Sequence, residues 1–165
     1  MEYTRAMFLM QQTYATLFSL ANKLQVKGDQ HLKHLTSRQL MAMIAIGHLP
    51  EDEASLNNIA RKLGTTKQSV KQLVTLLENN SYVVSTPSLR DKRAVNVVMT
   101  EVGKQVLIED GMLGMKFFDN LFHDFSQEEM ELLWSLLKKL YRYDGEEQDG
   151  FEGEMRIDQP DNGES

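Results

Sequence analysis

"SLNNIARKLGTTKQSVKQLVTLLENN", residues 55–80, is the stretch that decides the fold of this chain. It predicts two short helices joined by a tight turn. Ser55 can cap the first helix, and Gly64 suits the left-handed residue that ends it. Thr65 or Thr66 can cap the second helix, which runs to the end of the stretch. Two helices joined by so short a connection must cross steeply, which is the helix-turn-helix pattern.

The second helix has one apolar side and one polar side. The polar side carries lysine, glutamine and threonine, and it has no acidic residue before Glu78. Lysine suits phosphate contacts, while glutamine and threonine can form hydrogen bonds with base edges in the major groove. We therefore predict that this helix reads duplex DNA through Thr65, Thr66, Lys67, Gln68, Ser69, Lys71 and Gln72.

A predicted β-hairpin follows that helix. Two strand-like runs, SYVVS and AVNVVM, flank a tip that contains Arg90, Asp91, Lys92 and Arg93. Such a hairpin is a wing, whose cations can reach the minor groove next to the recognition helix. We predict that Arg93 enters the minor groove and that Arg90 and Lys92 contact phosphates. Asp91 is predicted to shape the tip by accepting hydrogen bonds from backbone amides or from Arg93.

Further helices are predicted on both sides of this unit. Apolar residues at helical spacing predict a long amphipathic helix over residues 4–24, and Thr36 with Gln39 has the spacing of a capping box. Another helix is predicted from Thr100 to about Phe125. Ser126 with Glu129 then begins the last one, whose apolar face is formed by Met130, Leu133, Leu137 and Leu140.

Charge is distributed unevenly along the 165 residues. The formal net charge is −6, but residues 144–165 alone contain nine acids and one arginine, a net of −8. The interval 60–104 carries eight basic and three acidic residues. The acidic, glycine-rich C-terminus is predicted to be disordered. The absence of cysteine excludes disulfides, and the short apolar run near the N-terminus favours a cytoplasmic protein without a membrane segment.

The central sequence resembles the MarR-type winged helix-turn-helix transcriptional regulators. The resemblance rests on Leu35-Thr36 with Gln39, on IARKLGTTKQSVKQLVTLLE, on Asp91-Lys92-Arg93-Ala94 and on VVMTEVG. One departure is that Ser81 or Tyr82 replaces the glycine usual after the recognition helix.

What the resemblance implies is a mainly α fold with a small β-hairpin wing. It also implies N- and C-terminal dimerisation helices, here including Leu133, Leu137 and Leu140. The expected divisions are 1–34 for the N-terminal helix and connection, 35–100 for DNA binding, 101–143 for C-terminal dimerisation and 144–165 for the acidic tail. The implied function is that of a homodimeric regulator, a repressor, on a pseudo-palindromic operator with half-sites about 10 base pairs apart.

Several alternatives stay open at this point. The acidic tail is also compatible with a winged-helix protein-interaction module that does not read DNA. A small aromatic ligand is a further possible partner, for which Met10, Met41, Met43, Met112, Met115, Phe117 and Phe118 could provide a pocket. His31 and His34 lack a third ligand at a useful spacing, so no metal and no cofactor is predicted. Without a phosphate-binding loop or a recognisable nucleophile, an enzyme is not expected.

Overall fold

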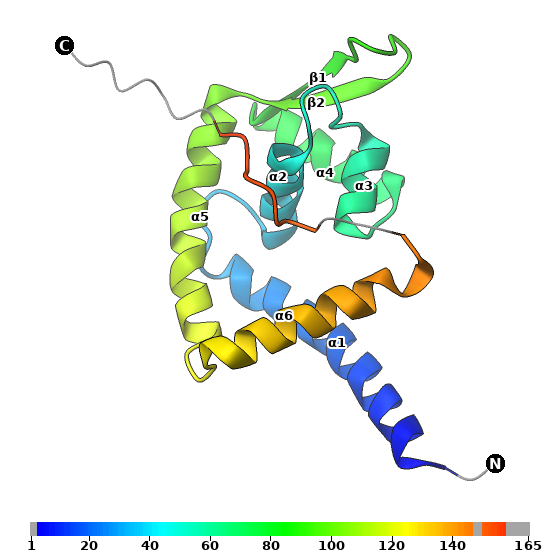
Figure 1. Ribbon diagram of the computed structural model, residues 1–165. Helices are drawn as coiled ribbons and strands as arrows, with labels where there is room; N and C mark the ends of the chain where they lie inside the picture. The colour runs from blue at the N-terminus through cyan, green and yellow to red at the C-terminus, as the bar shows by residue number, and fades with distance from the viewer. Residues whose placement is uncertain (1–2, 147–149, 158–165) are drawn as a thin grey trace.

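The computed structural model, described here for residues 3–146 and 150–157, consists mainly of helices with one small β-hairpin (Figure 1). The elements are α1 (Arg5–Asp29), α2 (Ser37–His48), α3 (Leu56–Leu63), α4 (Lys67–Asn79), β1 (Val83–Pro87), β2 (Val95–Met99), α5 (Glu101–Leu121), α6 (Gln127–Tyr141) and the short 3-10 helix η1 (Arg142–Asp144). The predicted fold class is confirmed, although α1 is longer than predicted and α5 ends four residues earlier. Over the residues described, no helix is both long and apolar enough to cross a bilayer.

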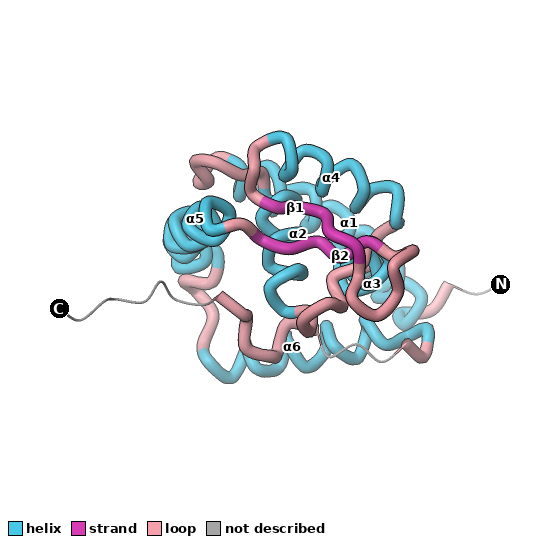
Figure 2. The backbone as a smooth tube through the Cα atoms, turned by 90° about the horizontal axis from the view of Figure 1, so that it is seen from above, coloured by secondary structure: helices cyan, strands magenta, loops and turns pink. Residues whose placement is uncertain are grey.

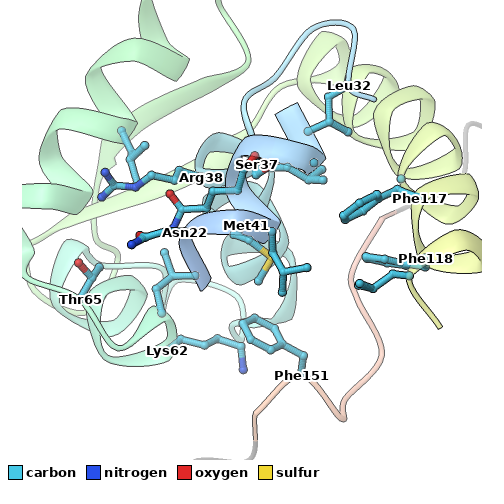
Figure 3. Close-up of a pocket in the computed structure, with 18 of the residues that line it drawn as sticks. Asn22, Leu32, Ser37, Arg38, Met41, Lys62, Thr65, Phe117, Phe118 and Phe151 are labelled. Atoms are coloured by element: carbon cyan, nitrogen blue, oxygen red, sulfur yellow. Dashed lines mark hydrogen bonds between the residues drawn. The ribbon is translucent and has the colours of Figure 1, made fainter. Parts of the chain in front are cut away.

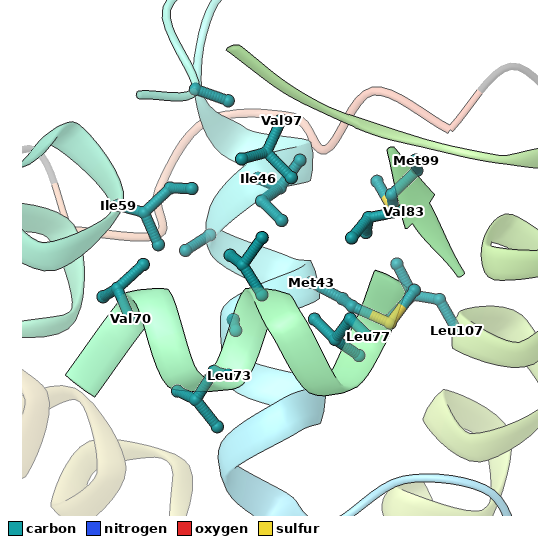
Figure 4. Close-up of a cluster of buried hydrophobic side chains, with 14 of the residues drawn as sticks. Met43, Ile46, Ile59, Val70, Leu73, Leu77, Val83, Val97, Met99 and Leu107 are labelled. Carbon is teal, nitrogen blue, oxygen red and sulfur yellow. The ribbon is translucent and has the colours of Figure 1, made fainter. Parts of the chain in front are cut away.

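The hydrophobic core surrounds α2 and belongs mainly to the winged helix-turn-helix unit. Its fully buried side chains include Met43 from α2, Ile59 from α3, Leu77 from α4 and Val97 from β2 (Figure 4). Burying each such side chain stabilises the fold by about 1.5–3 kcal/mol. By contrast, α6 has no buried residue, and the only buried residue of α1 is Gly28.

The helix-turn-helix forms through the local signals found in the sequence. The hydroxyl of Ser55 accepts a hydrogen bond from the Asn58 amide at 3.1 Å, and Gly64 ends α3 with φ +64°. Of the two candidate caps for α4, Thr66 has that role, because its hydroxyl accepts from the Ser69 amide at 3.1 Å. A residue with a Cβ is strained at positive φ, so Gly64 permits the tight turn that sets α4 across α3.

The wing is an antiparallel pair in which Val83 lies opposite Met99. The loop before α3 is hydrogen-bonded to β2, since the Val97 amide donates to the Ala54 carbonyl at 2.9 Å. Between α4 and β1, Ser81 has φ +61°, so Ser81 takes the left-handed position for which the sequence lacks a glycine. The hairpin therefore follows the recognition helix directly.

A buried carboxylate fastens α5 to the loop that leads into α2. Asp110 is fully buried and accepts hydrogen bonds from the amides of Lys33, His34 and Leu35 at 3.2, 3.0 and 2.8 Å. The neighbouring Glu109 accepts from His34 Nε2 at 3.1 Å at the surface. The hydrogen bonds to Asp110 therefore fix the position of this loop relative to α5, and with it the start of α2.

Part of the acidic C-terminus predicted to be disordered, residues 150–157, makes defined contacts with the folded unit. These residues cross α2 as an extended segment, and the side chains of Met155 and Ile157 pack against the core. The amide of Arg156 donates to the Gly47 carbonyl at 2.9 Å. The C-terminus as a whole is acidic and poor in apolar residues, but the few apolar side chains that it contains form this contact. Residues 147–149 and 158–165 lie outside the described part of the chain.

Candidate nucleic-acid interface

The polar side of α4 is exposed, as a recognition helix requires. Lys67, Gln68, Lys71 and Gln72 are all exposed, while the apolar side of the helix is buried against α2 and α3. No carboxylate lies on the first three turns of α4, so its exposed side is cationic and amide-rich. This combination can bind phosphates and form hydrogen bonds with bases.

The three predicted contacts at the start of α4 are placed differently from one another. Thr66 is exposed, and Ser69 is half-buried beside it. Their hydroxyl oxygens lie 3.0 Å apart in a hydrogen bond, which fixes the helix cap. Thr65 is half-buried and lines a large cavity on the inner side of the molecule. Among the residues predicted to contact DNA from the recognition helix, Thr65 is thus the one that faces the cavity.

The tip of the wing is shaped by short-range hydrogen bonds. The carboxylate of Asp91 accepts from the Arg93 amide at 2.9 Å, as the wing-shaping prediction expected. The hydroxyl of Ser88 accepts from the amides of Arg90 and Asp91 at 3.2 and 3.3 Å. These bonds order the tip and leave Lys92 and Arg93 exposed beyond it.

Asp52 holds the base of the tip, and sequence reasoning missed it. It adopts φ +60° in the loop between α2 and α3 and accepts hydrogen bonds from the Leu89 amide at 3.0 Å and the Ser88 hydroxyl at 2.9 Å. The Arg90 amide also donates to it at 3.2 Å. The backbone bond from Leu89 is the main reason why the pKa of Asp52 lies below its ordinary value. The partners are nearly forty residues away in sequence, so no local motif marks them.

Arg90 has a partner that the sequence did not indicate. Its guanidinium Nη1 lies 3.0 Å from Glu53 Oε1, in an ion pair exposed to solvent. Such exposed pairs contribute little, typically under about 1 kcal/mol. Arg90 can therefore exchange Glu53 for a phosphate at small cost, whereas Lys92 and Arg93 already point into solvent at the tip. Seen from above, α4 lies beside β1, so the recognition helix and the wing are adjacent (Figure 2).

A cavity of about 670 Å³ lies between the helix-turn-helix unit and the outer helices. Figure 3 shows Met41, Phe117 and Phe118 on its wall together with Arg38 and Lys62. Of the other side chains predicted for a pocket, Met43 is buried in the core, while Met10, Met112 and Met115 are exposed. Aromatic rings with the Arg38 guanidinium suit a small aromatic molecule that carries a negative charge, whereas the Lys62 ammonium group already contacts Gly150 and Phe151.

Two outer helices expose apolar faces. On α1, Met10, Tyr14 and Phe18 are each more than 60% exposed. On α6, the predicted dimer contacts Leu137 and Leu140 are 41% and 46% exposed, and Leu133 is half-buried. Further exposed apolar side chains are Leu132, Trp134 and Leu136. Exposed faces of this apolar composition are typical of an interface with another chain.

The histidines considered as metal ligands have other contacts. His31 Nδ1 donates to the Lys27 carbonyl, 2.8 Å away, and the His31 ring lies 5.0 Å from that of Phe117. His34 pairs with Glu109. Within residues 3–146 and 150–157, no group of three acidic, cysteine or histidine side chains converges as metal ligands would.

The geometry defines a winged helix-turn-helix protein, and comparison with known proteins shows which family it resembles. Residues 35–94 match the model of the MarR family. The predicted resemblance to the MarR family is therefore confirmed over these residues.

Solved structures show the same fold over most of the chain. A MarR/EmrR family transcriptional regulator from Acinetobacter sp. ADP1 is 24% identical, with 80% of this chain and 94% of the other covered and a TM-score of 0.71. Staphylococcus aureus MepR in complex with DNA is 23% identical, with 84% and 96% covered and a TM-score of 0.68. The organohalide-sensing regulator RdhR with 2,4-dichlorophenol bound is 17% identical, with 80% and 79% covered and a TM-score of 0.68.

Proposed function

We propose that this chain is a transcriptional regulator, not an enzyme, and that it binds duplex DNA as a homodimer and represses by occupying its operator. The observation that carries the proposal is the acid-free, exposed side of α4 directly beside a cationic wing. The family of residues 35–94, and a neighbour of the same fold named as a DNA complex, support the same class.

The role of each residue follows from its place in the fold. Lys67, Gln68, Lys71 and Gln72 would lie in the major groove with Thr66 and Ser69 at the helix start. Arg93 would enter the minor groove, and Lys92 and Arg90 would bind flanking phosphates. Thr65 is withdrawn from this set, because it faces the cavity.

Dimerisation would bury the apolar faces of α1 and α6. A twofold axis then places two α4 helices in successive major grooves, so the operator would be a pseudo-palindrome with half-sites about 10 base pairs apart. The functional divisions 1–34, 35–100 and 101–143 follow from this arrangement. The cavity would accept a small aromatic ligand, since it lies where the winged unit meets the outer helices.

The proposal is tested by selecting, from random duplex DNA, the sequences that the full-length protein binds in moderate salt. We expect a pseudo-palindrome to be recovered. On that operator, Arg93→Ala should reduce the slope of log affinity against log salt by about 2, because one phosphate or groove contact is lost in each half-site. Gln68→Ala should cost about 1–3 kcal/mol in each half-site and relax base preference at one position there.

Lys33→Ala is the matched control for the lost charge. Lys33 is exposed in the loop between α1 and α2, and Figure 1 shows this loop well away from the wing. Its removal should therefore leave both affinity and salt slope unchanged. If no sequence is enriched, or if Arg93→Ala and Gln68→Ala behave like Lys33→Ala, the DNA-binding role is wrong. A winged-helix module that binds another protein would then be the better description.

A further inference from the structure

Residues 150–157 are held against the winged unit at two separate places. At the first, the Lys62 ammonium group donates to the Gly150 carbonyl, and Lys62 Nζ lies 5.1 Å from the centre of the Phe151 ring. The same ring forms a T-shaped pair with the ring of His48, with the two ring centres 5.6 Å apart. Beside them, Glu152 forms an ion pair with Lys138 of α6 at 3.2 Å. The segment therefore contacts α2, α3 and α6 within three residues.

The second place depends on a glycine at the end of α2. A Cβ on Gly47 would lie 2.6 Å from Cγ of Met155 and 3.3 Å from Cε of Met99, so the segment approaches α2 as closely as it does because position 47 has no side chain. The Arg156 amide donates to the Gly47 carbonyl at 2.9 Å. Met155 is partly buried here, while its neighbour Glu154 is exposed.

This docking face lies on the side of α2 opposite to the recognition helix. In Figure 1 the segment crosses in front of α2 while α4 lies behind it, and Figure 2 again places α4 on the far side from α6 and the segment. The sequence from 144 to 165 carries a net charge of −8. A docked segment therefore holds two of these carboxylates, Glu152 and Glu154, on the face away from the cations of α4.

We infer that the surface formed by Gly47, His48, Lys62 and Met99 is a docking groove for the chain's own C-terminal segment. Docking there prevents the acidic tail from competing with DNA. When the segment leaves the groove, its carboxylates can reach the cations of α4 and the wing and occupy sites that phosphates would take. The second half of this inference rests on the proposed function, whereas the docking itself does not.

Hydrogen exchange tests the docking in the full-length protein. The Arg156 amide should be protected in the wild type and unprotected in the double variant Phe151→Ala with Met155→Ala. Glu154→Gln is the matched control within the segment, and it should retain the protection. An unprotected amide in the wild type, or continued protection in the double variant, would overturn the groove and its contacts.

DNA binding tests the consequence of release. We measure affinity for a 30-base-pair duplex of random sequence at low salt, with the wild type, the double variant and a third protein. The third protein combines the double variant with all nine tail carboxylates changed to amides. Release should weaken binding by about threefold to tenfold, and neutralising the tail should restore it, because the competition is electrostatic.

The outcomes separate this inference from the proposed function. If the wild type does not bind any duplex, the proposed function fails while the exchange experiment still decides the groove. If release leaves affinity unchanged, the tail does not compete with DNA. If affinity falls and the amides do not restore it, the loss is structural and the competitive role of the tail is refuted.

Discussion

Asp110 provides the sharpest test of how this fold is held together. Its carboxylate is fully buried on α5 and accepts three backbone amides from the loop before α2. Replacing it with alanine leaves those donors without an acceptor. Each unsatisfied buried donor costs about 1–3 kcal/mol, and an exposed one costs little because water replaces the acceptor.

The expected loss can be worked out donor by donor. Leu35 is 6% exposed, so its amide carries the full penalty, whereas Lys33 is exposed and can turn to water. His34 lies between these cases. With the cavity left by the carboxylate, Asp110→Ala should lower the free energy of unfolding by about 3–5 kcal/mol. For a chain of this length, that loss corresponds to a decrease in Tm of roughly 6–20 °C.

Glu109→Ala is the matched control, because the two carboxylates are neighbours on α5 and contact the same loop. Glu109 is exposed and pairs with His34 at the surface, so its loss should cost at most about 1 kcal/mol. Asp110→Asn should fall between the two alanine variants, since one oxygen still accepts. Chemical unfolding and thermal scans of the three variants give the comparison. Equal losses in Asp110→Ala and Glu109→Ala would refute the anchoring role of the buried carboxylate.

Two further predictions concern glycine packing and pH. Gly103→Ala should destabilise the protein by about 3 kcal/mol or more, because the new Cβ would lie 1.9 Å from the Tyr82 carbonyl oxygen. Gly111→Ala in the same helix meets no atom within 4 Å and should raise stability by up to about 1 kcal/mol, a contrast that a thermal scan would show. The lowered pKa of Asp52 means that its carboxylate stabilises the fold above its ordinary pKa and loses that effect as the pH falls below about 4. Stability measured from pH 6 to pH 2 should therefore fall less steeply in Asp52→Asn than in the wild type, and parallel curves would contradict this.

Features set by neighbours in sequence were predictable. Thr36 and Gln39 form a complete capping box at the start of α2, and Ser126 with Glu129 does the same at α6. Gly64 has the left-handed conformation that its place after α3 requires. Each of these signals needs only three or four residues, because the atoms that satisfy one another belong to a single helix turn.

Contacts between distant segments were not predictable in this way. Asp52 and Glu53 meet the wing from the loop before α3, and Asp110 meets a loop about 75 residues away. An aspartate that caps a distant loop has the same local sequence as one in solvent. The sequence around Arg90 therefore did not reveal its ion pair with Glu53. The sequence around Thr65 likewise did not reveal that this residue lines the cavity.

The C-terminal segment shows where a prediction from composition loses information. Average charge and glycine content describe residues 144–165 as unable to bury enough apolar surface. Docking, however, needs only Phe151, Met155 and Ile157, together with a place that fits them. Gly47 provides that place by having no side chain, and Lys62 adds a cation for the ring. The complementarity is a property of two segments a hundred residues apart, so it becomes visible only when the fold brings them together.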